Sequence, residues 1–107
     1  MPAPAITPEE LKARRDRGDS VVLVDVREPH EWAIAKIPGA RLVPLSAFTD
    51  SLHQFDSARD IVLHCKMGGR SAKAVRQLQA AGFKKVWNLA GGILRWSDDV
   101  DPKVPKY

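Results

Sequence analysis

The sequence predicts an α/β domain built on a mainly parallel central sheet with helices on both faces. Segments with strand character alternate with segments with helical character along the chain, an order typical of parallel sheets joined by right-handed crossovers. The expected strand over Val21–Val26 is apolar on both of its faces, which favours a strand covered by helices on each side. A length of 107 residues suits one core, so we expect residues 1–107 to form a single domain.

Residues 1–5 carry two prolines and are expected to form a loose lead-in. The first helix is predicted over Thr7–Gly18, since Thr7 is a good N-cap and Gly18 a good terminator. Pro8 suits the first helical position, and Glu10 at the third completes a capping box with Thr7. The later elements are expected as a strand over 21–26, a helix over 30–36, a strand over 40–43, a helix over 46–55, a strand over 61–65, a helix over 71–81, a strand over 85–89 and a helix over 93–97.

Each of these later elements has its own signal in the sequence. Pro29 favours the start of the helix over 30–36, and Gly82 ends the helix over 71–81. The helix over 46–55 is predicted from apolar residues that share one face, namely Leu45, Phe48, Leu52 and Phe55. The tail after residue 97 contains two prolines and is expected to end regular structure.

The composition is that of an ordinary soluble protein, with 44% hydrophobic and 28% charged residues. No apolar run approaches the roughly 18–20 residues that a membrane span needs, and the N-terminus lacks the features of a signal peptide. A single cysteine excludes an intramolecular disulfide and fits a reducing compartment. We therefore expect a cytoplasmic protein.

The formal net charge of +4 favours small anions or acidic partners. The cations are scattered along the sequence without interleaved aromatic residues, which argues against a nucleic-acid surface. His30 and His53 have no partner at metal-ligand spacing, so no metal site is expected. Nucleic acid, membrane and metal are thus not among the expected partners.

A candidate nucleophile lies at Cys65, the only cysteine of the chain. The segment from Cys65 to Arg70 reads CKMGGR and joins the end of a buried strand to the start of a helix. In open α/β sheets the ligand site lies at the carboxyl ends of the strands, where this loop is expected. Gly68 and Gly69 allow a tight loop whose backbone N–H groups turn inward. Arg70 and the helix N-terminus add positive charge.

These features stabilise a thiolate and so predict a lowered pKa for Cys65. They would also hold an anionic substrate or adduct against the nucleophile. A buried structural role is usual for an isolated cysteine, but the surrounding loop favours catalysis. Lys66 either recruits anions to this loop or is simply solvated.

The spacing within the loop bears on the kind of reaction. Protein tyrosine phosphatases place five residues between the cysteine and the arginine of a similar loop, whereas four separate Cys65 from Arg70. The shorter loop makes a smaller cradle, poorly matched to a phosphoryl group with three equatorial oxygens. It suits a single sulfur atom bonded to the cysteine, so the spacing argues against a phosphatase or an arsenate reductase.

The chain resembles the rhodanese-like domain family of sulfurtransferases over nearly its whole length. The matching segments, in the family's order and spacing, are VDVREPHEW, IPGA, HCKMGGRSAKA and NLAGGILRW. In particular it is similar to the C-terminal rhodanese domain of ubiquitin-activating-type adenylyltransferase/sulfurtransferases, and the ending DPKVPKY is similar to that subgroup. Lys36 stands where the family commonly has a histidine, so no role of that histidine is transferred to this chain.

The resemblance implies a rhodanese-like fold and a sulfurtransferase in which Cys65 holds a sulfane sulfur as a persulfide. Arg70 would help to bind an anionic donor such as thiosulfate, or the sulfur would come from a protein persulfide. The acceptor would be cyanide in vitro and a thiol or a sulfur-carrier protein in the cell, in a ping-pong cycle without metal or organic cofactor. The residues expected to bind substrate and persulfide are Lys66, Met67, Gly68, Gly69, Arg70 and Ser71.

Other charged residues are expected to support this site. Asp25, Arg27 and Glu31 follow the first buried strand, and a buried ion pair that braces the carboxyl edge of the sheet is expected among them. His64 precedes Cys65 on a strand, so its side chain should point to the opposite face. The main alternative function is a rhodanese-like docking module without turnover, which the intact Cys65 and Arg70 disfavour.

Overall fold

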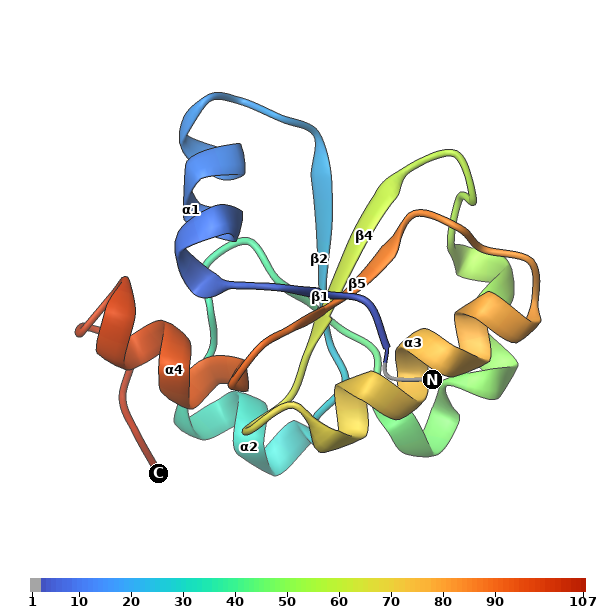
Figure 1. Cartoon of the computed structure of the whole chain (residues 1–107). Coiled ribbons are helices and arrows are strands. Elements are labelled where there is room, and N and C mark those ends of the chain that lie inside the picture. Colours follow the sequence, from blue (N-terminus) through green and yellow to red (C-terminus); the bar gives the residue numbers. More distant parts are fainter. Residues whose placement is uncertain (1–2) are drawn as a thin grey trace.

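The computed structural model describes residues 3–107 and contains the α/β fold predicted from the sequence (Figure 1). Its sheet has five strands in the order β1-β5-β4-β2-β3. All of the pairings between neighbouring strands are parallel. The strands are β1 (Ala5–Ile6), β2 (Val21–Asp25), β3 (Arg41–Leu42), β4 (Asp60–His64) and β5 (Val86–Leu89).

Helices cover both faces of this sheet, as predicted (Figure 1). They are α1 (Pro8–Asp16), α2 (Pro29–Ile34), α3 (Gly69–Ala80) and α4 (Gly92–Asp99). Alternate residues of β4 point into two separate cores, since Leu63 packs with Val75 of α3 and Val62 packs with Leu11 of α1 and Ile93 of α4. Among residues 3–107, the structure contains no helix with the length and apolar composition needed to cross a membrane.

The predicted N-cap of α1 is confirmed. Thr7 Oγ1 accepts a hydrogen bond from the backbone N–H of Glu10, and Glu10 Oε1 accepts one from the N–H of Thr7. The two bonds satisfy donors that a helix start otherwise leaves unpaired.

The prediction of an α-helix over 46–55 is wrong in the type of helix. The segment forms two 3₁₀ helices, η1 (Leu45–Ala47) and η2 (Thr49–Gln54). Its hydrogen bonds span three residues, for example from Phe48 N–H to the carbonyl of Leu45 at 3.1 Å. Short polar side chains compete with the helix backbone here, while the fully buried Phe48 still anchors the segment in the core.

The first strand, β1, was not predicted, because part of it falls in the expected lead-in over 1–5. Residues 1–2 of that lead-in lie outside the described residues. Ala5 pairs with Asn88 and Ile6 with Leu89 along the edge of β5. Two residues are too few to show the alternation that identifies a strand.

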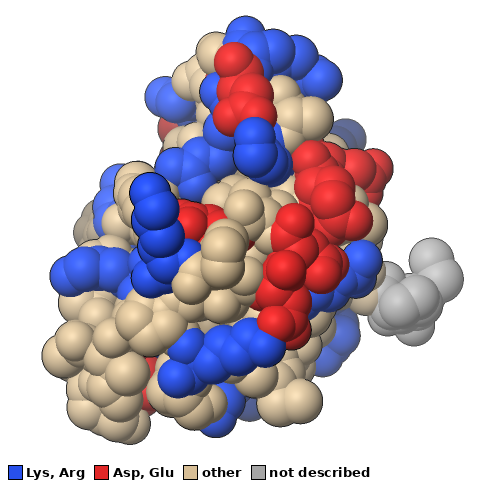
Figure 2. Space-filling model, turned by 90° about the vertical axis from the view of Figure 1, so that its left-hand side faces the viewer, with Lys and Arg blue, Asp and Glu red and all other residues tan. Residues whose placement is uncertain are grey.

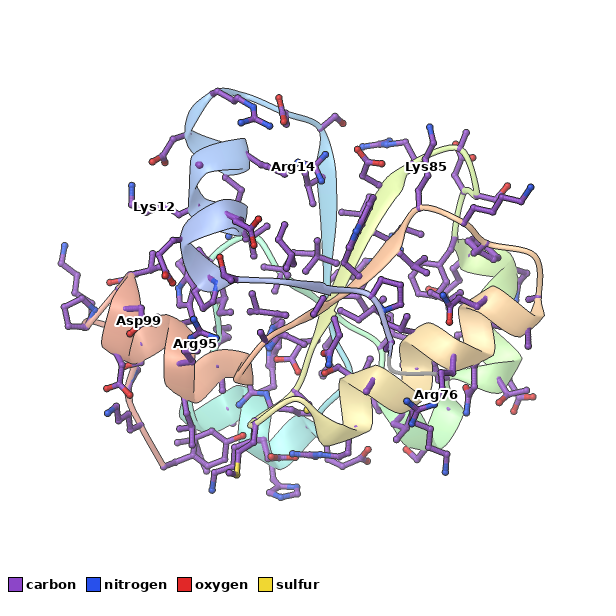
Figure 3. All side chains as sticks on the ribbon, in the orientation of Figure 1. Lys12, Arg14, Arg76, Lys85, Arg95 and Asp99 are labelled. Carbon is purple, nitrogen blue, oxygen red and sulfur yellow. The ribbon has the colours of Figure 1, made fainter. Side chains whose placement is uncertain are left out.

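Charged side chains of both signs are interleaved on the face formed by α1 and α4 (Figure 2). Ion pairs join Lys12 to Asp16 on α1 and Arg95 to Asp99 on α4 (Figure 3). A nucleic-acid backbone binds to a continuous basic surface. The described residues of this face do not form such a surface.

Candidate active site at the Cys65 loop

Cys65 directly follows the central strand β4, at the carboxyl edge of the parallel sheet. Its side chain is only 2% exposed and belongs to the core beneath α3. The chain then turns through four residues into Arg70, the second residue of α3. The thiol therefore lies at the sheet edge where ligands bind in open α/β folds.

The loop turns inward at Gly68, the N-cap of α3. Its φ of +114° lies in a region that other residues rarely adopt. This conformation directs the N–H of Gly68 to Cys65 Sγ at 3.1 Å. The carbonyl of Gly68 accepts the first hydrogen bond of α3, from the N–H of Ala72. One glycine thus starts the helix and gives the sulfur a backbone donor.

Ser71 and Asn88 brace the loop from the side of β5. Ser71 Oγ lies 3.4 Å from Cys65 Sγ and 2.5 Å from Asn88 Oδ1. Since a hydroxyl has one proton, Ser71 donates to only one of these acceptors at a time. Asn88 Nδ2 donates to the carbonyl of Gly68 at 3.0 Å, so the amide links the loop to the sheet.

Hydrogen bonds to the sulfur set the acidity of Cys65. Burial alone would raise the pKa of the thiol. The hydroxyl of Ser71 and the backbone N–H groups of Ser71, Gly68 and Met67 outweigh burial, so the pKa of Cys65 lies below its ordinary value. The loop consequently favours the thiolate, the nucleophilic form of cysteine.

The N-terminus of α4 supports the Cys65 loop through hydrogen bonds to its backbone carbonyls. The N–H of Ile93 donates to the carbonyl of Cys65 at 2.9 Å, and the N–H of Leu94 donates to that of Lys66 at 3.3 Å. A Cβ on Gly92 would lie 2.4 Å from the Lys66 carbonyl oxygen and 2.6 Å from that of Cys65. The approach of helix and loop therefore depends on the absence of a side chain at Gly92.

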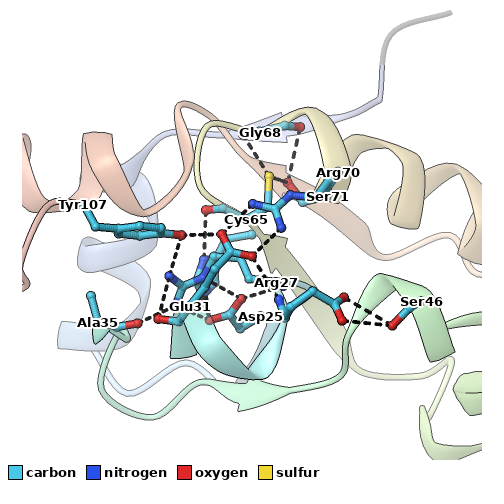
Figure 4. A network of polar contacts seen from close by, with 12 residues as sticks. Asp25, Arg27, Glu31, Ala35, Ser46, Cys65, Gly68, Arg70, Ser71 and Tyr107 are labelled. Carbon is cyan, nitrogen blue, oxygen red and sulfur yellow. Dashed lines mark hydrogen bonds and ion pairs between the residues drawn. The ribbon is translucent and has the colours of Figure 1, made fainter. Parts of the chain in front are cut away.

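Arg70 lies beside the sulfur of Cys65 but is bound to a carboxylate (Figure 4). Its Nη1 donates to Glu31 Oε1 at 2.6 Å and its Nη2 donates to Oε2 at 2.8 Å. Arg70, aided by Tyr107 and the N–H of Glu28, holds the pKa of Glu31 well below its usual range. Glu31 in turn raises the pKa of Arg70, so both groups are charged.

The expected buried ion pair forms between Asp25 and Arg27. Arg27 is fully buried, and its Nη2 lies 2.6 Å from Asp25 Oδ2. Its remaining donors reach the carbonyl of Ala35 at 2.5 Å and the hydroxyl of Tyr107 at 2.8 Å. That hydroxyl donates to Glu31 Oε2 at 2.7 Å. The third framework residue, Glu31, thus pairs with Arg70 and connects to Arg27 through Tyr107.

His64 is buried beside this network. Its Nδ1 lies 3.4 Å from the carbonyl oxygen of Cys65, and its Nε2 lies 3.7 Å from Asp25 Oδ2. Burial lowers the pKa of His64 to about 4, so the ring is neutral near pH 7. The ring therefore contacts the backbone of Cys65 and the carboxylate of Asp25.

The structure brings Lys66–Ser71 together as one loop at Cys65, with Met67 exposed at the surface. Three other residues of the site were not singled out from the sequence: Asn88, Gly92 and Tyr107. Asn88 was detectable as a polar residue within an apolar strand, and Gly92 as half of a glycine pair. Tyr107 had no local signal, because its contacts are with residues far away in the sequence.

The structure thus combines a parallel α/β fold with a loop that stabilises a thiolate at the carboxyl end of β4. The chain belongs to the rhodanese-like domain family, whose family model matches residues 7–99. A crystal structure of a rhodanese-like domain protein from Staphylococcus aureus has a TM-score of 0.84 and 34% identity, and covers 97% of this chain and 98% of that one.

Relatives of known sequence include proteins named sulfurtransferases. The probable adenylyltransferase/sulfurtransferase MoeZ of Mycobacterium tuberculosis is 40% identical over 104 residues, which cover 95% of this chain and 26% of that protein. A sulfurtransferase of Allochromatium vinosum is 36% identical over 92 residues, which cover 86% of each chain. The chain thus spans about a quarter of the length of the first of these relatives.

Proposed function

We propose that the protein is a sulfurtransferase that carries sulfane sulfur as a persulfide on Cys65. The observation that carries this proposal is the N–H of Gly68, 3.1 Å from Cys65 Sγ at the N-terminus of α3. A donor in this position stabilises a sulfur anion. Membership of the rhodanese-like family and relatives named sulfurtransferase support the same reaction class.

In the first half-reaction the Cys65 thiolate attacks the outer sulfur of thiosulfate or the terminal sulfur of a protein persulfide. With thiosulfate, a new S–S bond forms at Cys65 while the S–S bond of the donor breaks. Sulfite leaves with the bonding electron pair, and the negative charge of the thiolate passes to the terminal sulfur of the persulfide. The loop Lys66–Ser71 would hold that sulfur through its backbone N–H groups.

In the second half-reaction a thiophilic acceptor attacks the terminal sulfur and Cys65 leaves as a thiolate. Cyanide would become thiocyanate in this step, and the two half-reactions form a ping-pong cycle. The acceptor in the cell would be a thiol or a sulfur-carrier protein. Relatives named adenylyltransferase/sulfurtransferase, of which this chain spans a part, support a sulfur-carrier protein.

Mass spectrometry of the intact protein after incubation with thiosulfate tests this proposal. The wild type is expected to gain the mass of one sulfur atom and to lose it when cyanide is added. Cys65→Ser should gain none. A wild type without the adduct, or an equal adduct on Cys65→Ser, would overturn the proposal.

Two activity assays, run beside the mass measurement, separate the alternative functions. A docking module would give no adduct and no thiocyanate from thiosulfate and cyanide. A phosphatase would hydrolyse an aryl phosphate in a reaction lost in Cys65→Ser. We expect no such hydrolysis, because the four residues between Cys65 and Arg70 make a small cradle for a phosphoryl group.

A further inference from the structure

Two cations belong to the Cys65 loop, and they differ in what surrounds them. Arg70 gives N–H groups to both carboxylate oxygens of Glu31, at 2.6 and 2.8 Å. That carboxylate is ionised, because Arg70, Tyr107 and a backbone N–H all donate to it. The charge of Arg70 is therefore offset by a full negative charge at hydrogen-bond distance.

Lys66, the residue next to the nucleophile, has different surroundings. Within residues 3–107, no ion pair joins it to a carboxylate. Its ammonium nitrogen lies 4.5 Å from the centroid of the Tyr107 ring. An aromatic ring attracts a cation through its quadrupole and has no net charge, so the charge of Lys66 is not cancelled by this contact.

The Tyr107 ring is held in place by contacts of its own hydroxyl and by the packing of the C-terminal tail. The hydroxyl donates to Glu31 at 2.7 Å and accepts from Arg27 at 2.8 Å (Figure 4). Earlier in the tail, Val104 is buried and its carbonyl accepts a hydrogen bond from Ser97 Oγ at 2.6 Å. The tail thereby brings a fixed aromatic surface to the edge of the sheet at which Cys65 lies.

We propose that Tyr107 is a positioning residue that seats Lys66 at the Cys65 loop, and that Lys66 supplies the charge that draws an anionic sulfur donor to Cys65. This inference rests on the proposed sulfurtransferase function and names the donor class as a small anion. Arg70 and Glu31 then brace α2 against α3. The expectation that Arg70 itself binds the donor stays a prediction that the same experiments test.

Two alkylating reagents of similar size measure this charge directly. Iodoacetate is anionic and iodoacetamide is neutral, so the ratio of their rates at Cys65 reports attraction of an anion. Lys66→Met is expected to lower this ratio about fivefold at low salt, and far less at high salt. The KM for thiosulfate should rise by a similar factor, with a smaller effect on kcat. Lys85→Met, at the opposite edge of the sheet (Figure 3), is the matched control.

Substitutions at Tyr107 test the positioning role. Tyr107→Leu should lower the rate ratio about twofold, and Tyr107→Phe, which keeps the ring, should restore most of that loss. Equal losses in the two variants would overturn the role of the ring and assign the effect to the hydroxyl contacts with Glu31 and Arg27. Thermal melts of each variant establish that the chain is folded.

The remaining outcomes decide between the two cations. An unchanged ratio in Lys66→Met would overturn the inference. A larger effect of the double substitution Glu31→Gln with Arg70→Gln would assign the anion to Arg70. Alkylation requires only a thiolate, so an altered ratio without a persulfide would overturn the proposed sulfurtransferase function and leave the anion site standing.

Discussion

The carboxylate of Glu31 and the guanidinium of Arg70 face each other through two hydrogen bonds, at 2.6 and 2.8 Å. The pair joins α2 to α3 beside the sulfur of Cys65 (Figure 4). A positive charge near a thiol stabilises its thiolate and a negative charge opposes it. Glu31 therefore moderates the effect that Arg70 exerts on Cys65.

Glu31→Gln is expected to lower the pKa of Cys65 by about half a unit, because the substitution leaves Arg70 uncompensated. The midpoint of the iodoacetamide alkylation rate against pH measures this pKa. Glu9→Gln, at an exposed position of α1, is the matched control. A pKa equal to or above that of the wild type would contradict the moderating role of Glu31.

Ser71→Ala is expected to raise the pKa of Cys65 by about half a unit, because the thiolate loses a donor. The hydroxyl lies 3.4 Å from the sulfur and also bonds Asn88, so the effect should be smaller than that of a full hydrogen bond. The same alkylation profile measures it. Ser51→Ala, whose hydroxyl bonds a backbone carbonyl of η1, should leave the profile in place. A wild-type profile for Ser71→Ala would assign the low pKa to backbone donors alone.

Gly92→Ala is expected to destabilise the protein by more than about 2 kcal/mol. Its φ is +61°, and the new Cβ would collide with the carbonyls of Lys66 and Cys65. Gly18→Ala is the matched control, because Gly18 has a φ of +83° and open space around it. Urea unfolding measures both variants. Equal losses would mean that backbone conformation, and not contact with the Cys65 loop, determines the cost at Gly92.

The parts of the fold that the sequence predicted are those with local causes. Thr7 caps α1 through residues within one turn, and the strand Val21–Asp25 is identified by its own apolar residues. The segment 46–55 was predicted with the correct buried Phe48 but the wrong hydrogen bonds, because apolar spacing does not separate a 3₁₀ from an α-helix over so few residues. The strand Ala5–Ile6 exists only through its pairing with β5.

The residues of the candidate site also divide into those with a local signal in the sequence and those whose contacts join distant positions. The six residues after Cys65 are consecutive in the chain, so the sequence shows their glycines and cations and the spacing between Cys65 and Arg70 directly. The partnership of Glu31 with Arg70 joins positions 39 apart, and that of Arg27 with Tyr107 joins positions 80 apart. Such contacts depend on how the elements pack. The sequence could therefore predict the cradle for the sulfur and the charged residues near it, but not which of those charged residues pair with one another.

His64 makes the stability of the fold depend on pH. The pKa of its buried ring is lowered from 6.5 to about 4, so between these values the unfolded chain binds more protons than the folded protein. Stability therefore rises with pH through this window and is lost as pH falls. From pH 7 to pH 5 the loss should be about 2 kcal/mol.

The loss of stability between pH 7 and pH 5 should be absent from His64→Asn, because asparagine does not titrate. Urea unfolding at pH 7 and pH 5 measures the free energy of unfolding of each protein. At pH 5 only a minor fraction of a carboxylate such as Glu31 is protonated in the unfolded chain, so carboxylates add little to the change over this range. His53→Asn, at an exposed position of η2, is the matched control and should keep the wild-type slope. An identical slope in His64→Asn and wild type would mean that the folded protein accommodates a charged His64 as readily as water does.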